Sequence, residues 1–153
     1  MNNVALLDAN SDSSMFVTIC INKQMLGIPV EYVRDVLREQ HVTTIPLSPP
    51  EVAGSLNLRG RIVTVINMRH RLRLPAAEEG ATNMFVVVEY NNELYSLMVD
   101  SVGDVLTVSN AEIEKAPSNI AGAWKEVASG VYKLPEELLV IVSVETLLNL
   151  GAS

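Results

Sequence analysis

The residues that could carry out catalysis are few and lie apart in this sequence. His41 and His70 are the only histidines, and Cys20 is the only cysteine, with no histidine near it in the chain. A catalytic nucleophile needs a base within hydrogen-bond reach, and a zinc ion needs three or four nitrogen or sulfur ligands. The glycines match neither a serine-hydrolase elbow nor a phosphate-binding loop. We therefore expect no catalytic residue, no metal and no cofactor, which favours a binding protein over an enzyme.

Two carboxylates, Asp100 and Asp104, are the remaining candidates for acid–base chemistry or for a cation site. On an extended chain, residues four apart point to one face but lie about 13 Å from each other. Solvated or ion-paired side chains are the ordinary interpretation of such a pair. A small β-barrel enzyme that uses Asp100, Asp104 or His41 stays an alternative.

The charges argue against nucleic acid as a partner. Five of the eleven lysines and arginines lie within residues 59–73, but the whole chain has a net charge of −7, which repels duplex DNA and anionic membranes. No aromatic side chain lies among those arginines to stack on bases.

The sequence predicts a cytoplasmic protein without direct membrane insertion. Residues 1–14, expected to be a flexible leader, lack the basic start and apolar length of a signal peptide, and no run reaches the ~20 apolar residues of a membrane span. A single cysteine excludes an internal disulfide, which suits a reducing compartment.

The elements that must position these residues are predicted to be short strands. Apolar runs at Phe16–Ile21 and Met25–Val30 flank an Asn22-Lys23 turn, which is the pattern of a β-hairpin. The composition of Glu31–Arg38 fits a helix or a strand, and we favour a strand. A further short strand is expected at His41–Ile45.

A second hairpin and a short helix are predicted over Gly54–Arg69. The run Ile62–Ile66 is strongly β-branched, Arg59 and Gly60 lie in the turn before it, and Asn67 is a good helix N-cap.

The second half of the chain resembles the first. Residues 15–37 laid on residues 84–106, an offset of 69 without gaps, are identical at nine of 23 positions. At an offset of 76, residues 62–66 fall on 138–142 and Asn67 falls on Ser143, which predicts a capped helix over Val144–Leu150. Chance similarity of β patterns is the alternative to a duplication.

The fold class predicted from this repeat is all-β. We expect two similar five-stranded SH3-like β-barrels with a C-terminal helix. They form one domain over 15–153, with subdomains at about 15–73 and 84–150 and a linker over 74–83. Exchange of strands between the two subdomains is left open.

The two copies differ at one place that suggests a function. Arg59-Gly60-Arg61 of the first copy corresponds to Pro135-Glu136-Glu137 of the second. A solvated arginine beside a turn glycine is one interpretation. The other is a partner-recognition site, where Arg59 donates charge-assisted hydrogen bonds and Gly60 lets another backbone approach.

Two motifs resemble those of the CheW family of bacterial chemotaxis coupling proteins. They are Asn57-Leu58-Arg59-Gly60 followed by Ile62-Val63-x-Val65-Ile66, and Val99-Asp100-x-Val102-x-Asp104-Val105-Leu106. The resemblance covers about Met15 to Leu148. It implies two intertwined five-stranded barrels without enzymatic activity. It further implies an adaptor that joins the cytoplasmic tip of a transmembrane chemoreceptor to the regulatory domain of a histidine kinase, at the inner face of the membrane.

The resemblance also implies where the partners bind. In the family the receptor tip docks between the barrels, and the matching positions here are Val33, Asp35, Val36, Arg59 and Gly60, with Val99 and Val102 across the seam. Gly54 and Asn57 match positions that contact the kinase or the receptor, and the kinase is expected mainly at the second barrel. Core packing is the alternative role for the valines.

Two departures from the family pattern leave the pathway open. Thr64 stands where the family usually has proline, and Asn67 where it usually has aspartate. An adaptor or regulatory module of another chemosensory pathway, such as surface motility, is therefore an alternative to chemotaxis.

Overall fold

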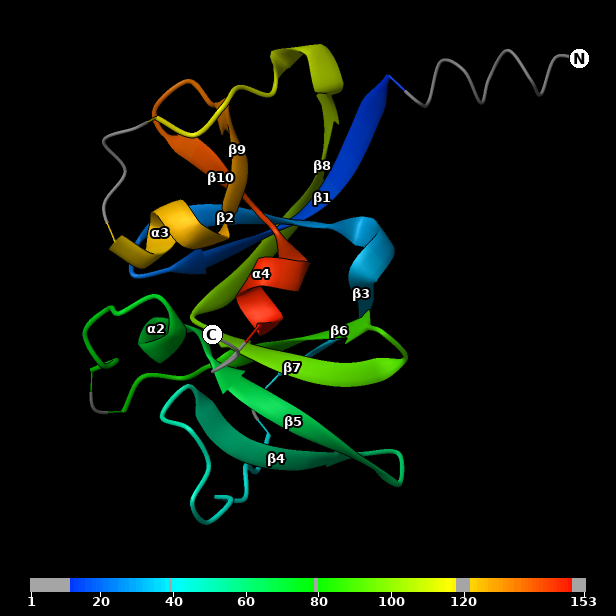
Figure 1. Cartoon of the computed structure of the whole chain (residues 1–153), viewed down its shortest axis with the longest axis vertical. Coiled ribbons are helices and arrows are strands. Elements are labelled where there is room, and N and C mark those ends of the chain that lie inside the picture. Colours follow the sequence, from blue (N-terminus) through cyan, green and yellow to red (C-terminus); the bar gives the residue numbers. More distant parts are fainter. Residues whose placement is uncertain (1–11, 39, 79, 118–121, 150–153) are drawn as a thin grey trace, which may run out of the picture.

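The computed structural model describes residues 12–38, 40–78, 80–117 and 122–149, with only the backbone described at 122 and 123. Two five-stranded sheets account for most of this part of the chain (Figure 1). The strands are β1 (Ser13–Ile21), β2 (Gln24–Pro29), β3 (Val33–Leu37), β4 (Val52–Leu58), β5 (Arg61–Asn67), β6 (Met84–Tyr90), β7 (Glu93–Val99), β8 (Ser101–Ser109), β9 (Ala128–Lys133) and β10 (Leu138–Val142). Short helices are η1 (Val30–Tyr32), α2 (Met68–Arg71), η2 (Asn110–Glu112), α3 (Gly122–Val127) and α4 (Val144–Leu148).

Each sheet takes strands from both repeats. We call the sheet with the strand order β8-β1-β2-β10-β9 barrel A and the sheet with the order β3-β6-β7-β5-β4 barrel B. Replacing every strand by its counterpart in the other repeat, β1 by β6, β2 by β7 and so on, converts one order into the other. The duplicated sequence therefore gives two equivalent sheets, but neither repeat builds a sheet alone.

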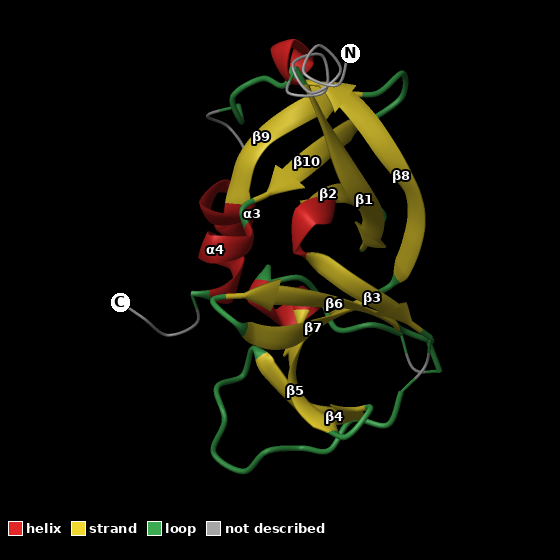
Figure 2. Ribbon diagram, turned by 90° about the vertical axis from the view of Figure 1, so that its right-hand side faces the viewer, coloured by secondary structure: helices red, strands yellow, loops and turns green. Residues whose placement is uncertain are grey.

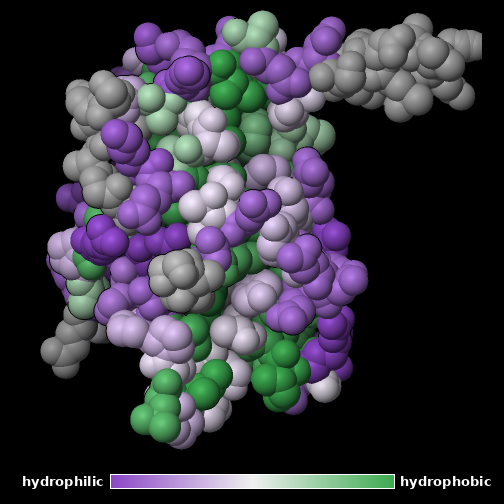
Figure 3. Space-filling model, in the orientation of Figure 1, coloured by the Kyte–Doolittle hydropathy of each residue, from purple (hydrophilic) through white to green (hydrophobic). Residues whose placement is uncertain are grey.

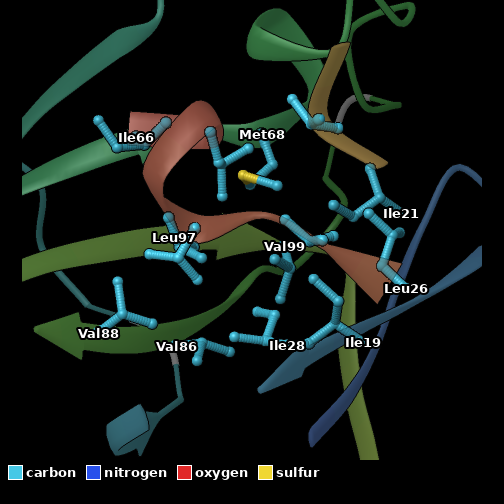
Figure 4. Packing of buried hydrophobic residues seen from close by; sticks show 14 of the residues in the cluster. Ile19, Ile21, Leu26, Ile28, Ile66, Met68, Val86, Val88, Leu97 and Val99 are labelled. Atoms are coloured by element: carbon cyan, nitrogen blue, oxygen red, sulfur yellow. The ribbon is translucent and has the colours of Figure 1, made fainter. Parts of the chain in front are cut away.

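The main hydrophobic core lies between the two barrels. Figure 4 shows Ile19 and Ile28 of barrel A facing Val86 and Val99 of barrel B, and all four side chains are at most 1% exposed. Burying one aliphatic side chain of this size stabilises a fold by about 1.5–3 kcal/mol. Because this layer needs both barrels, it couples their stability.

Strands β1 and β6 are buried on both faces, which explains their nearly continuous apolar sequence. Val86 and Val88 face the shared core, whereas Phe85 packs inside barrel B. In the same way Phe16 packs inside barrel A. The matched Met-Phe-Val sequences of the two repeats therefore serve the same packing role.

The predicted helix caps are present. The side chain of Asn67 accepts a hydrogen bond from the backbone N–H of His70, and the Ser143 hydroxyl accepts one from the N–H of Thr146. The final helix ends at Leu148, two residues earlier than expected, and Leu150 lies outside the described residues.

Two of the predicted strands differ from the structure. His41–Ile45 forms no strand, and only one bridge, between Thr43 and Ser55, ties it to β4. Pro46 lacks the N–H that would extend this pairing. Within Glu31–Arg38, the predicted strand exists only over Val33–Leu37, after a turn of 3-10 helix.

Candidate functional site

The turn between β4 and β5 presents Arg59 at the surface of barrel B. Leu58 and Arg61 pair directly, so the loop has two residues, Arg59 with φ +52° and Gly60 with φ +86°. Positive φ at both positions is typical of a type I′ hairpin. The Asn57 side-chain oxygen accepts a hydrogen bond of 2.9 Å from the N–H of Gly60, so Asn57 supports the turn from within the chain.

Arg59 reaches across to the edge strand β3. Its guanidinium lies 3.1 Å from the Asp35 carboxylate, and the two side chains are 76% and 26% exposed. The other carboxylate oxygen of Asp35 accepts a hydrogen bond from the N–H of Val36. The structure thus joins two residues that are 24 positions apart in the sequence and that both belong to the predicted site.

A small hollow of about 280 Å³ lies beside this ion pair. A second ion pair, Arg34–Glu89 at 3.0 Å, lies at the same hollow. The side chains around the hollow are charged at the rim and apolar beneath, and they comprise Arg34, Asp35, Leu58, Arg59, Arg61, Val87, Glu89 and Leu94.

The predicted valines lie in three different environments. Val36 is 40% exposed on β3. Val33 and Val102 are half-buried against the shared core. Val99 is only 1% exposed within that core, so its side chain is not at the surface. Val99 faces the shared core, whereas its neighbour Met98 packs inside barrel B. The sequence pattern alone does not determine which face each residue takes.

Val105 is an exposed valine that the sequence analysis did not assign to the site. It is 47% exposed on β8, which is an edge strand of barrel A as β3 is of barrel B. Figure 2 shows β3 and β8 on the same flank of the molecule. Val105 matches Val36 when the two repeats are aligned. The repeat could therefore have identified Val105 as a site residue from the sequence.

Gly54 has a structural position rather than a surface one. It is buried with φ +150°, and a Cβ atom there would lie 2.1 Å from the carbonyl oxygen of Thr43. The two N–H···O bonds between Thr43 and Ser55, both 2.8 Å, hold the preceding loop against β4 at this point. Gly54 therefore permits the loop to close over the strand.

The arginines of residues 59–73 do not form a basic patch. Arg69 binds Asp100, Arg71 donates to the carbonyls of Thr146 and Leu147 at the end of α4, and Arg73 lies 3.8 Å from Glu126. Most of the arginines in this segment are therefore already paired with carboxylates or carbonyl groups of the same chain.

The candidate acid–base residues lie in different environments. Partial burial raises the pKa of Asp100, but hydrogen bonds from Arg69 and from the N–H of Asn22 bring it below its usual value. Asp104 and His41 are exposed. Among the residues described, no group of three histidine, cysteine or acidic side chains is placed to hold a metal ion.

Hydrophobic surface area gathers at the lower end of the molecule in Figure 3. Among the described residues, the most exposed large hydrophobic side chains are Leu47 and Ile62, at 104% and 72%.

None of the helices in the described part of the chain is both long enough and apolar enough to span a bilayer.

Comparison with known proteins places these features in a family. The model of the CheW-like domain matches residues 15–151. A chemotaxis protein CheW of Bacillus subtilis is 28% identical over 137 residues, which are 90% of this chain and 88% of that protein. A chemotaxis protein CheW of Treponema pallidum is 26% identical over 92% of this chain and 85% of its own length.

A solved structure has the same fold. The crystal structure of the scaffolding protein TtCheW from Thermoanaerobacter tengcongensis superposes with a TM-score of 0.81 at 22% identity, covering 92% of this chain and 95% of that one. The family model, the relatives and the paired barrels agree along nearly the whole chain. The chain therefore belongs to the family of CheW-like domains.

Proposed function

We propose that this chain is the coupling adaptor of a chemotaxis pathway, and that it binds a chemoreceptor through the flank that carries Asp35, Val36 and Arg59. Members of the CheW family are non-catalytic scaffolds that couple receptors to a kinase. The receptor tip and a histidine kinase are the proposed partners, and receptor binding would hold the chain at the inner face of the membrane.

The backbone conformation of Arg59 supports this site. The other two tight hairpins begin their turns with Asn22 and Asn91, at φ +52° and φ +53°, and asparagine tolerates this region well. A left-handed conformation costs other L-residues about 1–2 kcal/mol. Arg59 takes the place of asparagine at the first position of this turn and is 76% exposed, which supports a role in binding a partner.

The apolar part of the proposed contact comes from the two edge strands. Val36 on β3 and Val105 on β8 are 40% and 47% exposed. The two strands lie on the same flank of the molecule (Figure 2). An amphipathic helix binds through a row of apolar side chains against such a surface. Val99 supports this flank from the core and does not itself contact the partner.

Gly60 suits the same contact. Nothing lies within 4 Å of a Cβ atom built on it, so the turn is open to an approaching backbone. Gly54 and Asn57 act indirectly, since they shape the loop and the turn. The kinase is proposed to bind mainly at the second barrel, which corresponds best to barrel A, because β8, β9 and β10 of this sheet come from residues 84–150.

The experiment is a pull-down from a lysate of the native bacterium with tagged wild type, Val36→Asp and Arg59→Ala, followed by identification of the captured proteins. We expect wild type to retain a chemoreceptor and a histidine kinase. Both variants should retain the kinase and lose most of the receptor.

Arg73→Ala is the matched control, because Arg73 is 70% exposed and ion-paired, like Arg59, but lies away from the hollow. Capture of receptor by Arg59→Ala at the wild-type level would contradict the site. Receptors and kinases of a motility system, captured in place of chemotaxis ones, would favour an adaptor of that other pathway.

A further inference from the structure

We infer that the hollow beside Asp35 and Arg59 accepts an acidic side chain of the receptor tip, with Arg61 as the cation that binds it. This inference rests on the proposed function and adds the chemistry of the partner at the same site. Arg61 had no role in the sequence analysis beyond its place in the turn.

The charges around the hollow do not cancel. Arg34 pairs with Glu89 at 3.0 Å and Arg59 pairs with Asp35 at 3.1 Å. Arg61 lines the same hollow but makes none of the ion pairs found among the described residues. The hollow therefore has three cations against two anions, in a chain whose net charge is −7.

The strand direction aims Arg61 at the hollow. Side chains alternate along β5, and Val63 and Val65, two and four residues further on, are fully buried inside barrel B. Arg61 shares their face at the mouth of the barrel, opposite Leu58 in the register. Ile62, on the other face, is 72% exposed and points away.

The floor of the hollow strengthens an ion pair made there. Leu58, Val87 and Leu94 are buried or half-buried, and they exclude water from one side of the site. A charge pair that loses part of its water interacts more strongly than one on an open surface. Guanidinium binds carboxylate through two parallel hydrogen bonds, so Arg61 would also orient the acidic side chain.

Barrel A carries the opposite charge at the equivalent place. Glu136 and Glu137 replace Gly60 and Arg61, and the exposed Asp104 is the counterpart of Asp35. An acidic side chain would be repelled there. The same receptor segment is therefore directed to barrel B alone, and the repeat does not create a second receptor site.

The test uses the helical-hairpin fragment of the receptor tip from the same bacterium, titrated with wild type, Arg61→Gln and Arg61→Lys at two or more salt concentrations. Arg61→Gln should weaken binding by about 5- to 20-fold at low salt and flatten the salt dependence. Arg61→Lys, which keeps the charge but loses the paired hydrogen bonds, should fall between the two. Arg73→Gln is the control for net charge, and it should bind as wild type does.

A charge exchange identifies the partner residue. Each acidic residue on the surface of the fragment is changed in turn to arginine, and one of these variants should bind Arg61→Glu better than it binds wild type. Equal affinity of wild type and Arg61→Gln at every salt concentration would overturn the inference, as would an equal loss in Arg73→Gln. Absence of any binding by wild type would instead overturn the proposed function.

Discussion

Arg59 has a backbone conformation that is unfavourable for an arginine. Its backbone lies at φ +52°, where Asn22 and Asn91 stand in the other hairpins. Its ion pair with Asp35 is solvent-exposed, and such pairs contribute about 0–1 kcal/mol. The pair therefore offsets little of the conformational cost. The stability of the fold therefore does not explain why an arginine stands at position 59.

Arg59→Asn should consequently leave the free energy of unfolding unchanged or raise it by up to about 1 kcal/mol, because asparagine followed by Gly60 is the preferred pair for a type I′ turn. Urea denaturation measures this. A loss of more than about 1 kcal/mol would mean that Arg59 has a structural role that the exposed ion pair does not explain.

Ser96, in the middle of β7, has a hydroxyl group in an unusual environment. Its hydroxyl is fully buried and, among the residues described, is the only buried side-chain polar atom without a hydrogen-bond partner. It lies in the cross-strand row that runs from Asp35 through Val87 to Val65. An unpaired buried hydroxyl costs about 1–3 kcal/mol.

Ser96→Ala should therefore be neutral or stabilise the protein by up to about 1 kcal/mol, since it removes this cost and leaves only a small cavity. The midpoint of thermal unfolding measures it. A destabilisation above about 1 kcal/mol would indicate that the hydroxyl has a partner in solution.

The sequence could single out Arg59 and Gly60 for the proposed site, but it could not tell which of the valines are exposed. Arg59 stands out because the second repeat has no counterpart. Val99, Val102 and Val105 are alike in type, and only the register of β7 and β8 decides that Val99 is buried and Val105 is 47% exposed. A shift of one residue inverts such an assignment.

At the scale of elements, the β4–β5 hairpin combines two glycines with different tasks. Gly54 is crowded by the backbone of Thr43, whereas Gly60 has open space around it, and both have positive φ.

Gly54→Ala should therefore lower the free energy of unfolding by about 3 kcal/mol, since the new methyl group has to displace the 42–43 loop. Gly60→Ala should cost only about 1 kcal/mol, from backbone strain alone. Denaturant titration of both variants, with wild type alongside, gives the two values. Equal losses would contradict the close contact between Gly54 and Thr43.

Most elements could be predicted from the sequence because their patterns are local. Alternation, the Asn22-Lys23 turn and the caps at Asn67 and Ser143 depend only on neighbouring residues. The strand expected at His41–Ile45 is absent because, within the described residues, this segment pairs only through the bridge between Thr43 and Ser55. The prolines after it supply no N–H donors to extend that pairing.

In the molecule as a whole, the ion pair between Arg69 and Asp100 stabilises the junction between the two barrels. The guanidinium of Arg69 on α2 donates two hydrogen bonds, of 3.0 and 2.6 Å, to Asp100 between β7 and β8. The N–H of Asn22, in the β1–β2 turn of barrel A, donates to the same carboxylate. Three segments of the chain thus meet at Asp100.

The lowered pKa of Asp100 sets the pH dependence of this junction. An unfolded aspartate has a pKa of about 3.9, and the folded value lies below it, so the stabilisation is complete above the unfolded value and is lost as the pH falls through the folded value. Asp100→Asn should destabilise the protein by about 1–3 kcal/mol at pH 7, and the difference from wild type should shrink below about pH 4. Urea denaturation between pH 2 and 7 measures it, and a difference independent of pH would contradict the role of the charge.

The exchange of strands between repeats is the feature that the sequence could least determine. Each repeat has the apolar pattern of a complete five-stranded unit, and the pattern is satisfied whether a strand pairs within its own repeat or with the other one. The choice depends on the long shared core, where β1 and β2 meet β6 and β7.

Reconstituted signalling tests whether the chain couples receptor to kinase through the flank that carries Arg59. Receptor-containing membranes and the kinase from the same bacterium are mixed with wild type, Arg59→Asn or Arg73→Asn, and kinase autophosphorylation is measured. We expect wild type and Arg73→Asn to stimulate the kinase only when receptor is present. Arg59→Asn, although folded and as stable as wild type, should give less than about a tenth of that stimulation. Full stimulation by Arg59→Asn would contradict the role of Arg59, and no stimulation by wild type would contradict the coupling function.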